Sequence, residues 1–232
     1  MPKTIINIPD IGDVEFSKNT RAKSIRIHIS GSRVKVTYPR YVSRLVAKTY
    51  VISKKSWINE HKTTSHEFHN GDLIGKQHRL ELKNTSSQKV TSKVSTDTLH
   101  INIPDQLDPQ SPEVQKKIKA KIEKILKTEC ENLITDRLKD IAYENNLNFK
   151  SINYKKLSRR WGSCDNKHNI ILNIYLVQLP WDLIDYVIVH ELAHTIELNH
   201  SLSFWAIVES ILPEYKKNKK DIKNHAPEAY VF

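Results

Sequence analysis

The stretch YVIVHELAH, residues 186–194, decides the fold and the chemistry of this 232-residue chain. His190 and His194 are four residues apart, so in a helix they lie one turn from each other on one face, and both rings can reach the same metal ion. Glu191 follows the first histidine. A carboxylate beside a cation suits hydrolysis, because the cation makes a bound water more acidic and the carboxylate takes its proton. The stretch therefore predicts a helix that carries a hydrolytic metal site.

A third ligand is expected after this helix. Pro180 is favoured at a first helical position, and the apolar pattern continues from it to Leu198. In an unbroken helix, His200 would point about 240° away from His194. We therefore expect Asn199 to end the helix, because asparagine tolerates the left-handed backbone conformation found at helix ends.

Ser201 is expected to start a second helix, Leu202–Leu212. With His200 as the third ligand, three imidazoles and one open position give the coordination of a catalytic zinc site. The expected cofactor is Zn²⁺, one per chain, with manganese, cobalt and nickel as the other divalent candidates. Glu209, on the second helix, is the alternative third ligand and ranks below His200.

The segment RRWGSC, residues 159–164, lies between two short expected strands, the second at residues 170–174. Arg159 or Arg160 could bind a substrate anion or stabilise an oxyanion, and Ser163 could donate a hydrogen bond. The alternative is a structural role, in which the tryptophan packs in the core, the glycine relaxes a turn and the arginines are surface charges. The candidate substrate-binding residues are Arg159, Arg160 and Ser163.

The amino-terminal half has the pattern of β-structure. Residues 24–38 alternate apolar and polar side chains around Gly31-Ser32, which predicts a hairpin with its turn at these two residues. Ser43 is expected to cap a helix that runs through Ile58. The apolar positions of that helix predict a buried stripe formed by Leu45, Val46, Tyr50 and Trp57.

The expected fold class is α+β, with a β-rich amino-terminal half followed by a zincin-like helical metallohydrolase half with a short sheet. Three prolines mark a change of period, and a long amphipathic helix is expected from Val114. The expected domains are therefore a basic β-rich region, 1–110, and a metallohydrolase domain, 111–232.

Composition places the chain among folded proteins of the aqueous phase. Apolar residues make up 38% and charged residues 27%, which excludes collagen-like and disordered chains. No run approaches the roughly 20 apolar residues of a membrane helix, and the first residues lack the apolar region of a signal peptide. We expect a cytoplasmic protein without membrane association. Cys130 and Cys164 have no CxxC spacing, so a cysteine metal site is not expected.

The charge is concentrated near the amino terminus. The net charge is +11, and eleven Lys/Arg but no acidic residues lie between Glu15 and Glu60. Clustered cations attract nucleic acid, nucleotide phosphates or an acidic partner. A solvated basic face is the alternative, because no known nucleic-acid-binding motif accompanies the cluster.

Several motifs together resemble the YgjP-like metal-dependent hydrolases, which are related to the SprT-like and WLM zinc metallopeptidases. They follow the family's order: RWGSC at 160–164, ILN at 171–173, LP at 179–180, YVIVHELAH at 186–194, NHS at 199–201, FW at 204–205 and PEY at 213–215. The resemblance implies that His190, His194 and His200 are metal ligands and that Glu191 is the general base.

Three functions remain compatible with these residues. The first is a zinc metallopeptidase, in which an extended peptide pairs with an edge strand at 170–174 and Glu191 activates a water bound to a metal held by the three histidines. The second is a metal-dependent nucleoside triphosphate pyrophosphatase, an activity associated with the resembled family. The third is a non-enzymatic nucleic-acid-binding module with a structural metal, although a structural site has no need of Glu191.

Overall fold

The computed structural model describes residues 4–30, 33–61 and 67–230 and has the predicted α+β class, with strand-rich sheets followed by helices. Contacts divide the chain into two compact units, Met1–His66 and Glu67–Val231. The expected domain boundary after Gln110 differs from this division and stays a prediction. Within the described residues, no helix combines the length and the hydropathy needed to cross a membrane.

The first unit contains a four-stranded sheet and two helices. The strands are β1 (Thr4–Ile8), β2 (Gly12–Asn19), β3 (Arg26–Ser30) and β4 (Arg33–Pro39), in the order β1-β2-β4-β3. Strands β3 and β4 pair antiparallel, as the hairpin pattern predicted, and the expected turn residues 31–32 lie outside the described residues. Alternate side chains, including Val14, Phe16 and Val36, form the core of this unit.

The prediction of which face of the first helix is buried is wrong. The helix is divided into α1 (Arg44–Ser53) and α2 (Lys55–His61), and Leu45 is 73% exposed. Val46, Tyr50 and Trp57 are exposed as well, whereas Ala47, Val51 and Ile58 are fully buried. The small Ala47 side chain lets α1 approach β4 closely. This favours burial of the helix face that carries Ala47 and Val51 over burial of the face with the bulkier side chains. The predicted cap is confirmed, since the Ser43 side chain accepts a hydrogen bond from Val46 N at 3.2 Å.

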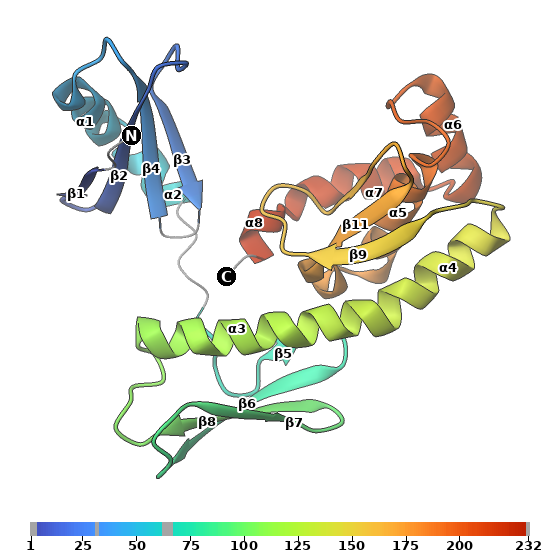
Figure 1. The fold of residues 1–232 in the computed structure, drawn as a ribbon, viewed down its shortest axis with the longest axis horizontal. Coiled ribbons are helices and arrows are strands. Elements are labelled where there is room, and N and C mark those ends of the chain that lie inside the picture. The colour runs from blue at the N-terminus through green and yellow to red at the C-terminus, as the bar shows by residue number, and fades with distance from the viewer. Residues whose placement is uncertain (1–3, 31–32, 62–66, 231–232) are drawn as a thin grey trace. The chain divides into compact units, whose positions relative to one another are not determined.

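The second unit begins with another four-stranded sheet, built from β5 (Leu73–Ile74), β6 (His78–Thr85), β7 (Thr91–Val94) and β8 (Thr98–Pro104). This sheet packs on a long helical rod (Figure 1). The rod consists of α3 (Pro112–Glu129), one π-helical turn (Cys130–Ile134) and α4 (Thr135–Glu144). It confirms the long amphipathic helix, with Ile118 and Leu138 fully buried.

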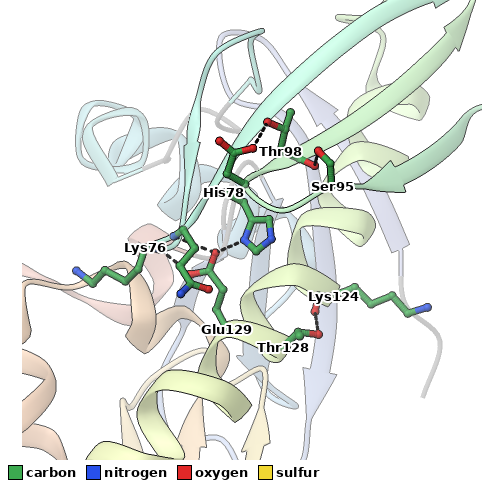
Figure 2. Close-up of polar contacts among 9 residues, drawn as sticks. Lys76, His78, Ser95, Thr98, Lys124, Thr128 and Glu129 are labelled. Carbon is green, nitrogen blue, oxygen red and sulfur yellow. Dashed lines mark hydrogen bonds and ion pairs between the residues drawn. The ribbon is translucent and has the colours of Figure 1, made fainter.

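A buried carboxylate ties the sheet to this rod (Figure 2). Glu129 is 0% exposed and accepts hydrogen bonds from Lys76 N at 2.6 Å, Gln77 N at 3.2 Å and His78 Nδ1 at 2.6 Å. Gly75 has a φ of 60°, and a Cβ atom there would collide with the same carboxylate. The Lys76 ammonium group in turn donates to Leu179 O at 2.6 Å. The β5–β6 turn is therefore fixed to the end of α3 and to the residue that precedes Pro180.

The remaining elements surround the helix that carries His190 and Glu191. A sheet of β9 (Ser151–Lys155), β10 (Gly162–Cys164) and β11 (Asn169–Asn173) is followed by a 3-10 helix, Ile174–Gln178, and by α5 (Trp181–Ala193). Then come α6 (Leu202–Ile211), α7 (Tyr215–Asp221), a 3-10 turn (Ile222–Asn224) and α8 (Pro227–Tyr230). Helix α5 contacts α4, α6, α7 and β10, so it lies at the centre of this part (Figure 1).

Candidate metal centre

Helix α5 supplies the predicted ligand His190 and the predicted base Glu191, and His194 caps its carboxyl end. Pro180 directly precedes it, and Asp182 lies in its first turn, where a negative charge is favoured by the helix dipole. Ile188 and Leu192 are fully buried, as expected of a helix that has neighbours on all sides. The chemically reactive side chains are therefore attached to a rigid, buried support.

Helix α5 ends at Ala193, earlier than the predicted end at Leu198. The chain then turns, and the Glu197 carbonyl accepts a hydrogen bond from His194 Nδ1 at 3.0 Å. The His194 ring can bond to this carbonyl only because the chain after Ala193 is no longer helical. Ser201 starts α6 as predicted, and its hydroxyl accepts a hydrogen bond from a backbone N–H of the first turn.

The structure brings the three predicted ligands together. One ring nitrogen each of His190, His194 and His200 lies within 4.8 Å of the other two. The Nε2 atoms of His190 and His200 are 3.0 Å apart. Glu209, the alternative third ligand, is outside this group and pairs instead with Lys216, whose Nζ is 2.9 Å away.

The three rings have the chemical form that binds a transition metal. His194 donates through Nδ1, so its Nε2 carries the free lone pair. Burial, with the nearby charges of the other two rings, lowers the pKa of His190 to about 3. Burial also lowers the pKa of His200. Neutral imidazoles are preferred ligands of zinc and neighbouring divalent ions, so the residues present fit such an ion.

Aromatic side chains of α6 and α7 hold the ligand rings in place. The His200 ring stacks on Trp205 with centroids 5.8 Å apart, and Trp205 stacks on Tyr215 at 5.4 Å. Phe204 is fully buried, and its ring centroid lies 4.5 Å from that of His194. The FW pair of the sequence therefore packs against all three ligands.

Glu191 is a buried carboxyl group packed against a glycine. It is 5% exposed, and burial raises its pKa to about 8 against the opposing charge of Arg160. A Cβ atom at Gly162 would lie 2.6 Å from Glu191 Oε1, closer than atoms can pack. The sequence interpretation of Gly162 as a relaxed turn missed this role, because the glycine belongs to strand β10 and leaves room for the carboxylate.

The three histidines and Glu191 line one cavity of about 260 Å³. Arg160 and Ser163, two of the three candidate substrate-binding residues, line it as well, whereas Arg159 is not among its lining residues. Gly162 and Cys164 also line the cavity and were not predicted. The alternation of the RWGSC segment is too short to reveal that it faces α5.

The strand that borders the cavity differs from the predicted one. The sheet order is β10-β11-β9, so β11, residues 169–173, is the central strand and its two edges are occupied. The predicted edge strand at 170–174 is therefore wrong. Within the described residues, β10 pairs only with β11, and all three of its residues line the cavity.

The comparison with known protein families agrees with this chemistry. The family described as YgjP-like, metallopeptidase domain, matches residues 23–225. Two solved structures are similar over part of the chain, the metallopeptidase zymogens abylysin of Pyrococcus abyssi and jannalysin of Methanocaldococcus jannaschii. Each is 24% identical and aligns with 40% of this chain; the alignments cover 94% and 95% of their own chains, with TM-scores of 0.37 and 0.36. No curated protein matches the chain.

Proposed function

Since the chain belongs to the YgjP-like metallopeptidase family and is a metal-dependent hydrolase, we propose that it hydrolyses peptide bonds at a zinc site formed by His190, His194 and His200, with Glu191 as general base. The family had been indicated by the sequence motifs, and that prediction is confirmed. One observation supports the proposal most strongly: three converging imidazoles and a buried carboxyl group line the same cavity.

The side chains divide the chemistry between them. A divalent cation bound by the three imidazoles supplies Lewis acidity, which polarises a carbonyl group and makes water a stronger acid. Glu191 accepts a proton from the attacking water and later donates it to the leaving amine. Its Oε2 atom is buried without a hydrogen-bond partner among the described residues, so it is available for this exchange. The Glu197 carbonyl keeps the proton of His194 on Nδ1 and the ring in one orientation.

Strand β10 offers a docking edge for the substrate. An extended peptide would pair with the edge of β10 that faces away from β11, and its backbone would then lie beside Glu191. In this arrangement Arg160 stabilises the negative charge that develops on the carbonyl oxygen, and Ser163 donates a hydrogen bond to the substrate. Arg159 has no part in the proposal, because it does not line the cavity.

The triphosphate alternative has less support. The matched family is described as a metallopeptidase domain, which favours a peptide over a nucleoside triphosphate as substrate. Nucleic-acid binding through the basic stretch between Glu15 and Glu60 has no support from the comparisons either. The deciding experiment assays zinc-loaded protein in parallel against an unfolded protein and a panel of nucleoside triphosphates. Peptide fragments without nucleotide hydrolysis support the proposal, and the reverse result contradicts it.

A further inference from the structure

A second cavity of about 210 Å³ lies next to the metal cavity. The two cavities share Arg160, Gly162, His190 and Glu191. A substrate carbonyl group beside Glu191 would therefore lie directly next to the second cavity. The remaining lining residues are Trp161, Tyr186, Val187 and Ile222, which are all apolar or aromatic.

The walls of this second cavity are fixed by packing. Trp161 is 8% exposed, its Nε1 donates to His225 O at 2.8 Å, and Tyr230 meets its ring edge-on with centroids 5.3 Å apart. Tyr186 and Val187 project from the rigid helix α5, one turn before the ligand and the base. A cavity with fixed walls selects among side chains by size, since it does not collapse around a smaller one.

Its size and lining indicate the side chain that it would hold. An apolar cavity of about 150 Å³ accommodates a benzene molecule, so this one has room for a phenyl ring or a branched aliphatic side chain. Apart from His190 and Glu191, which also line the metal cavity, Arg160 is the only residue lining the second cavity that has a charged side chain. We propose that the cavity binds a large apolar side chain, aromatic or branched aliphatic, of the substrate residue next to the hydrolysed bond. This inference rests on the proposed peptide hydrolysis.

Binding is tested first without chemistry. N-acetyl-phenylalanine amide and N-acetyl-alanine amide are titrated into protein with labelled isoleucine and valine methyl groups, and NMR shifts are followed. The Ile222 and Val187 methyl signals are expected to move with the phenylalanine probe, which should bind about 10- to 100-fold more tightly than the alanine probe. Equal affinities, or shifts confined to other methyl groups, would overturn the inference.

Substitutions then test selection during cleavage. Ile222→Trp narrows the cavity and Ile222→Ala enlarges it. Ile211→Trp is the matched control, because Ile211 is similarly half-buried but lines neither cavity. Fragments of an unfolded protein, sequenced by mass spectrometry, should show large apolar residues at one position beside the cleaved bond. Ile222→Trp should shift this preference toward small residues by about 10-fold or more, and Ile222→Ala toward larger ones. The control should leave it unchanged.

The results separate this inference from the proposed function. Cleavage by the zinc-loaded protein with no side-chain preference, or a preference that neither Ile222 variant moves, overturns the inference and leaves the function intact. Tight binding of the phenylalanine probe without cleavage of any peptide overturns the proposed function. If Ile222→Trp does not fold, the smaller Ile222→Ala still decides the question.

Discussion

The backbone of Gly162 lies directly against the side chain of Glu191, so that a Cβ atom at residue 162 would come 2.6 Å from Oε1 and 2.7 Å from Cγ. The edge strand β10 and the helix α5 thus meet at the one carboxyl group proposed to move protons. The position of that group depends on the absence of a side chain on the opposing strand.

Gly162→Ala is expected to displace Glu191 while leaving the histidines in place. A displacement of about 1 Å in a catalytic group costs roughly 10²-fold in rate. We expect kcat/KM for peptide hydrolysis to fall by about that factor, with zinc content unchanged. The double variant Gly162→Ala/Glu191→Gln should be no slower than Glu191→Gln alone. Glutamine at position 191 has already lost the proton-accepting role, so displacing it has no further effect on the rate. Additive losses would contradict this explanation.

Glu191→Gln is expected to separate metal binding from hydrolysis. Glutamine has nearly the same size but accepts no proton at neutral pH, so turnover should fall by about 10² to 10⁴-fold. Zinc content and melting temperature, measured on the same preparation, should stay close to those of the unchanged protein. Near-normal turnover in folded, zinc-containing protein would remove Glu191 from the mechanism.

Replacing any one of His190, His194 and His200 by alanine is expected to empty the metal site. Elemental analysis of the unchanged protein should give one divalent ion per chain. Glu209→Ala is the matched control, because Glu209 pairs with Lys216 outside the histidine group. Retention of metal by His200→Ala together with its loss from Glu209→Ala would reverse the assignment of the third ligand.

Arg160→Gln is expected to lower kcat by about 10- to 10³-fold if its charge stabilises the developing oxyanion. KM should change less, since the interaction strengthens in the transition state. Arg159→Gln removes the same charge from the neighbouring residue, which does not line the cavity, and should leave kcat within about twofold. Equal effects of the two substitutions would indicate a general effect of positive charge.

Glu129→Ala is expected to destabilise the second unit strongly. Three donors, Lys76 N, Gln77 N and His78 Nδ1, would lose their buried acceptor. Breaking such a buried charged network costs about 3 to 5 kcal/mol of unfolding free energy. The control is Glu131→Ala, whose side chain is 51% exposed and pairs with Lys127, and which should change stability by about 0.5 kcal/mol or less. Denaturant titrations measure both, and a loss below about 1 kcal/mol for Glu129→Ala would contradict a stabilising role for the Glu129 hydrogen bonds.

Local sequence signals predicted the parts of the fold that depend on neighbouring residues. The alternation of residues 24–38 predicted the β3–β4 pairing, and Ser43 and Ser201 were found as helix caps. The histidine spacing predicted which rings converge. In each case the interacting groups lie a few residues apart or on one helix or hairpin, so hydrophobic periodicity and capping preferences are enough to predict the contact.

Features that depend on distant partners were missed. The face of α1 is chosen by the closeness of Ala47 to β4, which the apolar pattern does not reveal. Strand β10 has three residues, too few to show a period, and its edge position follows only from its pairing with β11. Gly162 and Glu129 act on groups far along the chain, and neither belongs to a pattern that marks its role.

The hydrogen bond from Lys76 to Leu179 also bears on how the protein is made. It joins residues 103 positions apart, and closing so long a loop costs chain entropy before the contact contributes. During synthesis, the β5–β6 turn leaves the ribosome long before the Leu179 carbonyl is available. The helix that bears the metal-binding pair follows that carbonyl directly. A nascent chain therefore cannot bring the three histidines together until His200 has been translated.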